Sequence, residues 1–301
     1  MTGDVPFNRE FEFRYAEAAP LSPLVRRVIA KNPSYFTFHG TGTYIVGRGR
    51  VAIIDPGPDD FAHVEALLAA VAGEEITHLL VTHTHRDHSP ATVALQRATG
   101  APSYGFGPHG TRRAGPTVEE GADYDFMPDH RLVDGDAISG EGWTIEAVHT
   151  PGHTSNHLCF ALAEEHALFC GDHVMGWSTT VVSPPDGDMA AYVASLGKLA
   201  ERGDAIYYPT HGAPIAEPQP FVRALIEHRN ERERQIAQAL GRGVETIADL
   251  VETIYTHVPD ALHGAAARSV LAHLIHMVET GRAECSGPLE EGGRFVAVSA
   301  P

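Results

Sequence analysis

Four side chains that can bind a metal lie within six residues of one another, in the segment His83-Thr84-His85-Arg86-Asp87-His88. The segment directly follows an apolar run at 76–81 that is typical of a buried strand. A loop at that point can direct His83 and His85 to one metal while Asp87 and His88 reach a second. Imidazole and carboxylate groups suit zinc and similar divalent ions. A His-rich surface turn is the alternative interpretation of this segment taken alone.

Three later motifs make the surface turn the weaker interpretation. His153 lies in HTPGHTSNH, Asp172 in CGDHVMG and His211 in YPTHG, and each motif follows a strand-like run. We therefore expect all of them at one edge of a sheet, together with the first cluster. The combined set contains three His and a bridging carboxylate for one metal, and two His, one Asp and the same carboxylate for another. Both sets leave a position for water, as a catalytic site requires.

Strand, loop and helix patterns recur through the first two thirds of the chain, as in layered α/β folds. Strand patterns occur at 43–46 and 51–54, joined by a Gly-rich turn, and at 76–81, 143–149, 158–162, 167–170 and 206–208. Apolar residues at helical spacing predict helices at 61–72, 90–99 and 189–199. Residues 101–130 are rich in Gly, Pro and Asp and are predicted to be irregular. The loops at 101–130 and 174–188 are expected to define which substrate fits.

The pattern changes near residue 218. Residues 217–220, Glu-Pro-Gln-Pro, are interpreted as a linker between a catalytic domain at 1–217 and a C-terminal domain at 218–301. Helices are predicted at 221–240, 246–258 and 260–280, followed by strands at 283–286 and 294–299. Three helices and then a hairpin is the order of a winged helix. The charged run HRNERER at 228–234 is most often a solvated face.

Composition limits the location and the partners of the chain. The 301 residues include 22 Lys and Arg against 39 Asp and Glu, a formal net charge of −17. Such a chain is a poor general binder of nucleic acid or of anionic membranes. The three sparse cysteines, Cys159, Cys170 and Cys285, do not form a disulfide framework. No signal peptide is visible, and no stretch approaches the roughly 18 apolar residues of a membrane span. We therefore predict a soluble cytoplasmic protein without a membrane partner.

The four motifs, in this order over about residues 43–212, resemble those of the metallo-β-lactamase superfamily. The resemblance implies an α/β fold, a four-layer αββα sandwich with a one- or two-metal site. It also implies a first metal bound by His83, His85 and His153. A second metal would be bound by Asp87, His88 and His211, and Asp172 would bridge the two.

Two of these residues indicate which branch of the superfamily the chain resembles. Asp172 and His88 stand where zinc lactamases that destroy penicillins typically use Cys and Arg. The pattern is instead similar to the hydrolase branch, with glyoxalase II, lactonases and ribonuclease Z. The stretch GDHVMGWSTTVVSPPDGDMAAYVASL, the segment HRNERERQI and the three-helix tail resemble the beta-lactamase-like protein 2 subfamily. Its members append a winged-helix-like domain, and some are endoribonucleases that act on single-stranded RNA.

The implied cofactors are two divalent metal ions, with zinc favoured over iron or manganese. A hydroxide that bridges them would be the nucleophile, because the metals lower the pKa of water. Asp87 is expected to orient this hydroxide and to pass a proton to the leaving group. Asp55, at a strand end, is a candidate for holding a histidine ligand in one tautomer. A turn residue that breaks the strand is the alternative role for Asp55.

Four residues are candidates for substrate binding. Trp177, Ser178 and Thr179 lie in the loop after Asp172, and Tyr104 lies in the irregular segment. Packing within these loops is the alternative role for all four.

Two classes of substrate remain open at this point. One is a small ester, thioester or lactone, and the alternative is single-stranded RNA, cleaved by an endoribonuclease. Residues 221–301 contain eight Arg and eleven Asp and Glu, a net charge of −3. A winged helix that grips a phosphate backbone should present a basic face, so a small-molecule substrate is favoured over RNA. The tail is then expected to act as a lid beside the site or as a module for homodimer formation.

Diiron flavoproteins of this fold use an acidic residue at one first-site histidine and add a flavodoxin-like domain, and neither feature is visible here.

Overall fold

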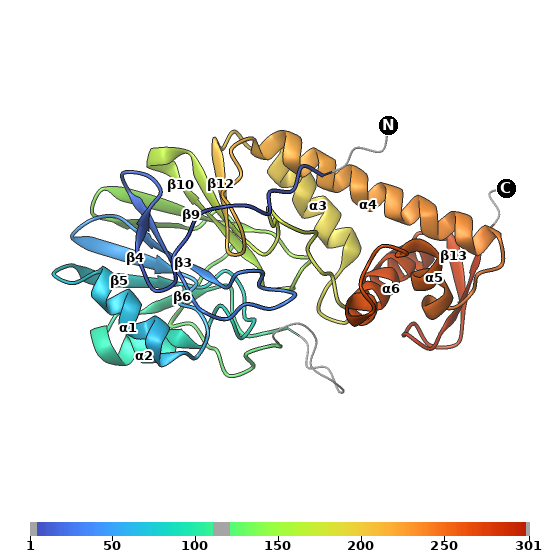
Figure 1. Ribbon diagram of the computed structural model, residues 1–301, viewed down its shortest axis with the longest axis horizontal. Helices are drawn as coiled ribbons and strands as arrows, with labels where there is room; N and C mark the ends of the chain where they lie inside the picture. Colours follow the sequence, from blue (N-terminus) through green and yellow to red (C-terminus); the bar gives the residue numbers. More distant parts are fainter. Residues whose placement is uncertain (1–4, 111–120, 299–301) are drawn as a thin grey trace.

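The computed structural model describes residues 5–110 and 121–298. Two sheets form a sandwich with helices on both outer faces, and a smaller helical unit lies at one end of it (Figure 1). This confirms the predicted four-layer α/β sandwich with a C-terminal winged-helix-like domain. Part of the irregular segment, residues 111–120, and Ser299 of the last predicted strand lie outside the described residues. Among the helices described, none is long and apolar enough to cross a membrane.

The first sheet contains seven strands in the order β1 to β7. They are β1 (Ala19–Pro20), β2 (Val25–Ile29), β3 (Gly42–Val46), β4 (Arg50–Ile54), β5 (Glu75–Leu80), β6 (Ser103–Gly105) and β7 (His130–Arg131). Pairing is antiparallel up to β4 and parallel from β4 to β7. Helices α1 (Phe61–Ala70) and α2 (Ala91–Thr99) cover the outer face, where Leu67 and Leu95 pack in one core with Ile45 and Ile53.

The second sheet contains five strands in the order β12-β11-β10-β9-β8. They are β8 (Ala137–Gly140), β9 (Trp143–His149), β10 (Leu158–Leu162), β11 (Ala167–Gly171) and β12 (Ile206–Pro209), with a short helix η1 (Ala163–Glu165) between β10 and β11. Tyr44 and Leu80 of the first sheet pack against Trp143, Phe160 and Phe169 of the second. This apolar layer packs the two sheets against each other.

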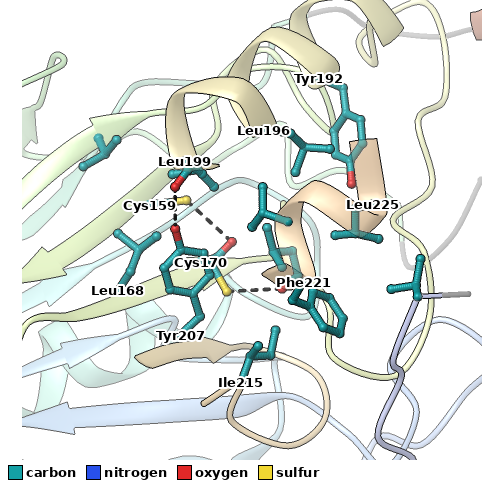
Figure 2. Packing of buried hydrophobic residues seen from close by; sticks show 14 of the residues in the cluster. Cys159, Leu168, Cys170, Tyr192, Leu196, Leu199, Tyr207, Ile215, Phe221 and Leu225 are labelled. Atoms are coloured by element: carbon teal, nitrogen blue, oxygen red, sulfur yellow. Dashed lines mark hydrogen bonds between the residues drawn. The ribbon is translucent and has the colours of Figure 1, made fainter. Parts of the chain in front are cut away.

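The outer face of the second sheet is covered by α3 (Met189–Ala200) and by the first half of α4 (Pro218–Gly241). Figure 2 shows Leu196 of α3 and Phe221 and Leu225 of α4 in one apolar cluster with Tyr207 of β12. The Tyr207 hydroxyl donates a hydrogen bond to the carbonyl of Leu199 at 3.0 Å. The buried phenol is therefore satisfied inside an otherwise apolar cluster.

Helix α4 begins inside the segment that the sequence predicts as a linker, so that prediction is wrong. Its first residue is Pro218, and a proline is tolerated in the first turn because its missing N–H would be unpaired there anyway. Phe221 and Leu225 belong to the core of the sandwich, whereas Ile236 and Leu240 belong to the core of the C-terminal unit. One continuous helix therefore joins the two units (Figure 1).

The C-terminal unit confirms the predicted order of helices and hairpin. It contains the second half of α4, then α5 (Ile247–Ile254), η2 (Asp260–Leu262), α6 (His263–Glu279), β13 (Ala283–Ser286) and β14 (Arg294–Ala297). Thr246 is the N-cap of α5, because its hydroxyl accepts a hydrogen bond from the backbone N–H of Asp249 at 3.2 Å. The start of this helix agrees with the predicted start at residue 246. Leu250, Leu274 and Phe295 meet in a separate apolar core.

The sequence patterns miss strands β1, β2, β6, β7 and β8, and β6 lies in the segment predicted to be irregular. In β2, two adjacent arginines conceal the apolar alternation. Arg26 forms an ion pair with Glu74 at 2.7 Å, and the buried Arg27 donates to the carbonyl of Gly212 at 2.8 Å. The partners of both side chains are far away in the sequence, and a local pattern does not contain them.

Candidate metal centre and substrate cavity

All seven predicted metal ligands gather at one edge of the sandwich, in the loops after strands. Four follow β5, and the others follow β9, β11 and β12. Their ligand atoms form three overlapping groups, each within 4.8 Å. The groups are His83, His85 and His153; His83, His88 and Asp172; and Asp87, His88 and His211. The expectation that four separate motifs converge is confirmed.

The first group consists of three imidazole nitrogens. Nε2 of His83 lies 3.1 Å from Nδ1 of His85, and Nε2 of His153 lies 3.2 Å from the same atom. Three nitrogens at this spacing fit the three-His set that the sequence predicts for one metal.

The second group adds a carboxylate. Oδ2 of Asp87 lies 3.2 Å from Nε2 of His88 and 3.1 Å from Nε2 of His211. Oδ2 of Asp87 also accepts a hydrogen bond from the Thr41 hydroxyl at 3.1 Å, which fixes the carboxylate in place. Asp172 lies between the two groups, with Oδ2 at 3.5 Å from Nε2 of His88 and at 4.0 Å from Nε2 of His153.

The ring nitrogens that face away from the centre have acceptors. Nδ1 of His153 lies 2.8 Å from the carbonyl of Val181, and Nδ1 of His211 lies 3.2 Å from the carbonyl of Gly40. A carbonyl can only accept, so each Nδ1 carries the proton and donates it. The lone pair of each neutral ring then lies on the inward Nε2, which is the tautomer that a metal ligand requires.

Asp55 organises the ring of His88. Its Oδ2 lies 2.8 Å from Nδ1 of His88 and accepts hydrogen bonds from the hydroxyls of Thr82 and Thr210, each at 2.9 Å. The Thr82 hydroxyl donates its proton to Asp55, so it accepts from Nδ1 of His83 at 3.1 Å. The backbone of Asp55 has a φ of 50°, consistent with a sharp turn after β4. Asp55 therefore has both of the roles considered for it, a turn residue and a support for two histidine ligands.

The centre contains more negative than positive charge. Burial lowers the pKa of His88, but the carboxylates of Asp87, Asp172 and Asp55 outweigh it and hold this pKa well above its usual value. The same balance, led by Asp172, raises the pKa of His211 to about 10. Burial raises the pKa of Asp87 and Asp172, but the neighbouring imidazoles outweigh it and lower both. These carboxylates need a positive countercharge in the same small space.

A divalent cation fits this requirement. It would supply the countercharge in place of the two imidazole protons, and metal binding of this kind releases protons. Two buried inward atoms, Nε2 of His88 and Oδ1 of Asp172, have no hydrogen-bond partner among the described residues. Buried polar atoms without partners are costly, and both atoms belong to residues of the candidate ligand groups. The cluster and its chemistry support a divalent-metal site.

Two further buried histidines do not contribute inward lone pairs. Nε2 of His157 accepts a hydrogen bond from the backbone N–H of Asp172 at 3.3 Å, and its Nδ1 lies 2.9 Å from the Thr150 hydroxyl. His157 is thus a hydrogen-bonded, packed residue. The ring of His173 lies against Tyr192, with ring centroids 4.6 Å apart, and burial lowers its pKa to about 3.

A cavity of about 300 Å³ opens above the centre. Its floor includes His85, Asp87, His153, Asp172 and His211. One wall comes from the N-terminal segment, the loop after β2 and the loop after β11, and it contains several aromatic side chains. This wall includes Phe7, Tyr35, Phe36 and Trp177.

Three of the four predicted substrate residues line this cavity. They are Trp177, Ser178 and Thr179. The ring of Trp177 stacks on Phe38 with centroids 4.6 Å apart, so packing and exposure to the cavity coexist there. Tyr104 is not among the lining residues, because it lies on β6 with its ring stacked on His130 at 4.7 Å. Its expected place at the cavity is therefore corrected.

The opposite wall belongs to the C-terminal unit, and sequence patterns missed it. The lining residues there are His228, Arg229, Arg232, Tyr255, Val258, Leu262, Ala265, Ala266 and Ser269. The first three lie in the charged run that was interpreted as a solvated face. Their spacing, at i, i+1 and i+4 of a helix, was the one available signal, because it places them on one side of α4. The sandwich and the C-terminal unit thus share one cavity.

Sequence comparison gives two family matches. Residues 37–211, more than half of the chain, match the family described as the metallo-beta-lactamase superfamily. Residues 246–288 match the beta-lactamase associated winged helix domain.

Similar proteins and structures give the same picture. An atrochrysone carboxyl ACP thioesterase of Aspergillus fumigatus is 36% identical over 261 residues, which cover 81% of this chain and 77% of the relative. A lactamase-like protein of Aspergillus niger is 33% identical over 84% of this chain and 79% of its own length. A beta-lactamase domain protein from Burkholderia ambifaria has a similar fold, with a TM-score of 0.78 at 19% identity over 94% of each chain.

Proposed function

The chain belongs to the metallo-beta-lactamase superfamily and carries the winged-helix domain associated with it, and we propose that it is a metal-dependent thioesterase. It is a hydrolase of this superfamily, and the acyl thioester is the specific part of the proposal. The observation that carries it is the position of the metal centre at the floor of an aromatic cavity. An apolar acyl group can occupy that cavity while its carbonyl lies over the centre.

We assign two divalent metals to the centre, preferably zinc. His83, His85 and His153 would hold one, and Asp87, His88 and His211 would hold the other, with Asp172 between them. Iron or manganese would also suit these ligand types. When bound, the metals would lower the pKa of a water molecule and polarise the thioester carbonyl.

The residues of the chain position these groups and handle protons. Asp55 and the outward carbonyls hold the imidazoles in the ligating tautomer. Asp87 faces the cavity and is held by Thr41, so it is placed to take a proton from the attacking water and return it to the leaving group. A thiol has a pKa near 8.5 and leaves readily as the thiolate, whereas an alcohol needs this proton more.

Several remaining assignments are part of the same proposal. We propose a catalytic domain at 1–217 and a C-terminal domain at 218–301. Residues of α4 contribute to the apolar cores of both. The C-terminal domain acts as one wall of the cavity, while homodimer formation stays a prediction. A cytoplasmic location is supported by the three cysteines, which are all free thiols. RNA is not the favoured substrate, because several curated relatives bear thioesterase names and residues 221–301 carry a net charge of −3.

A panel of substrates tests the proposal. Zinc-loaded protein is assayed on benzoyl and hexanoyl thioesters of N-acetylcysteamine, on a lactone, on a phosphodiester reporter and on single-stranded RNA. Asp172→Ala serves as the blank, and Asp134→Ala is the matched control, because Asp134 is exposed and pairs with Lys198. Thioester hydrolysis that is lost only in Asp172→Ala is expected. Cleavage of RNA with no thioester turnover would overturn the proposal.

A further inference from the structure

The C-terminal wall of the cavity contains two arginines whose charge is not balanced by an acid. Arg229 is only 3% exposed, and Arg232 is half-buried beside it on α4. The acids of the same helix pair elsewhere: Glu227 and Glu231 with Arg234, and Glu233 with Arg282. Within the described residues, no ion pair involves Arg229 or Arg232.

Arg229 lies close to the metal centre. Its guanidinium donates a hydrogen bond to the carbonyl of Thr180 and lies over the ring of Tyr192, 5.1 Å from the ring centroid. The Thr180 hydroxyl in turn donates to the carbonyl of Asp172 at 2.7 Å. Two hydrogen bonds therefore separate this cation from the backbone of a candidate metal ligand. The buried Nε of Arg229 has no partner among the described residues.

The guanidinium of Arg232 is held by two hydrogen bonds and by a contact with an aromatic ring. Nη1 of Arg232 donates to Oε1 of Gln235 at 2.9 Å and to the carbonyl of Ile254 at 3.4 Å. Its guanidinium lies 4.1 Å from the ring centroid of Tyr255, while its buried Nε has no partner in the described part of the chain. The guanidinium is thus fixed in orientation without being neutralised.

His228 adds a third donor or acceptor to this wall. It lines the same cavity, and its buried Nδ1 has no partner within the described residues. Burial, with the nearby arginine charges, lowers the pKa of His228 to about 4, so the ring is neutral near pH 7. The wall therefore combines two fixed cations with a neutral imidazole.

Two buried or half-buried cations without an acidic partner lower the stability of the fold. A buried charge without a partner destabilises a fold, and this chain has 39 acidic residues from which a partner could have come. The two carboxylates that line the cavity, Asp87 and Asp172, belong to the metal centre. The missing partner is therefore expected to come from the ligand.

We propose that Arg229 and Arg232 form a subsite for an anionic oxygen in the acyl group of the substrate. The inference rests on the proposed thioesterase function and specifies the acyl group that it takes, one with a carboxylate or an ionised hydroxyl. The acyl half is favoured over a phosphate of the thiol carrier, because Arg229 and Arg232 line the same cavity of about 300 Å³ as Asp87 and Asp172. A carrier phosphate is separated from the thioester by a long flexible arm.

Matched pairs of thioesters test this subsite. The N-acetylcysteamine thioesters compared are glutaryl with pentanoyl, adipoyl with hexanoyl, and 4-carboxybenzoyl with 4-methylbenzoyl. We expect the wild-type chain to prefer the anionic member of at least one pair by about tenfold or more in kcat/KM, since a charged hydrogen bond is worth about one factor of ten or more. Arg232→Gln should bring that ratio toward one, and Arg232→Glu should invert it.

Two further variants keep the test specific. Arg229→Lys preserves the charge and should retain part of the preference, whereas Arg229→Gln should lose it. Arg234→Gln is the matched control, because Arg234 lies on the same helix but is 53% exposed and does not line the cavity. It should leave the ratio unchanged. An equal preference for both members of every pair, or a preference that Arg232→Gln does not alter, would overturn the subsite.

The source of the anion and the proposed function are tested separately. If Arg232→Gln impairs all coenzyme A thioesters equally and no N-acetylcysteamine pair, the arginines bind the carrier phosphate and the proposal is wrong.

Binding of thioether analogues, in which CH₂ replaces the carbonyl, is followed by Trp177 fluorescence with Trp177→Phe as reference. Tighter binding of the anionic analogue that is lost in Arg232→Gln would support the subsite even if no thioester were hydrolysed. Equal binding of both analogues would contradict it.

Discussion

The floor and the C-terminal wall of the cavity differ in how their polar groups are satisfied. On the floor, Asp55, Thr41 and backbone carbonyls bind the ligand side chains from outside, and the two buried atoms left without partners belong to residues of the candidate ligand groups. In the C-terminal wall, Arg229 and Arg232 line the cavity without an ion-pair partner among the described residues. The floor is organised before a substrate arrives, whereas the wall is completed by one. We infer that the two domains divide the work, with the chemistry in the sandwich and the selectivity in the C-terminal unit.

Removing the shared ligand should have the largest effect. Asp172→Ala deletes the carboxylate that lies between the two groups and leaves His88 and His211 without its charge. Hydrolysis of every thioester should fall to the level of the uncatalysed reaction, and bound zinc measured by elemental analysis should drop. Anionic and neutral substrates should lose rate alike, because the floor does not select between them. Retained activity with full metal content would show that Asp172 has no part in the centre.

Asp87→Asn should affect turnover more than substrate affinity. A proton-transferring side chain typically contributes about 10²–10⁴-fold, and an amide cannot exchange this proton. The decrease in kcat should be greater for a lactone than for a thioester, because the alkoxide needs the returned proton more than the thiolate does. Steady-state kinetics on both substrates measures the difference. Equal decreases would limit Asp87 to metal binding.

Asp55→Asn tests the support behind the floor. The amide keeps the size of the side chain but weakens the hydrogen bond to Nδ1 of His88. Loss of such an outer partner lowers metal affinity by about 10–100-fold. Zinc competition with a chromophoric chelator gives the value. Asp204→Asn is the control: Asp204 is also buried but pairs with Arg202, so that variant should lose stability and keep its zinc affinity.

Trp177→Ala should have the smallest effect of these variants. The effect should be a rise in KM. The indole lines the cavity and stacks on Phe38, and an aromatic pair is worth about 0.5–1.5 kcal/mol. We expect KM for benzoyl thioesters to rise about 2- to 10-fold with kcat less affected. Trp143→Phe controls for loss of an indole, because Trp143 is buried between the sheets. A large fall in kcat alone would place Trp177 in the chemistry of the floor and weaken the comparison.

Much of the sandwich and its centre could be predicted from sequence because the signals are local. The strand patterns predict β9 and β10 with the observed boundaries, and β5 and β12 with boundaries that differ by one residue. The ligand motifs follow these strands directly, so predicting the strands also placed His83 and His211. Strand β2 was missed because the partners of Arg26 and Arg27 are distant in sequence. The linker at 217–220 was wrong because a first-turn proline is compatible with a helix.

The sequence by itself determined the class of chemistry, because metal ligands must occur as specific residue types and four of them lie within one short loop. Only the tertiary structure decided what else faces that centre. The run at 228–234 looks like a solvated charged helix, and nothing in its spacing tells which side is covered. Packing of the first half of α4 on the sandwich and of its second half on α5 and α6 turns Arg229 and Arg232 inward. The physical reason is that side-chain type is a local property, whereas burial of a helix face depends on apolar contacts between segments far apart in the chain.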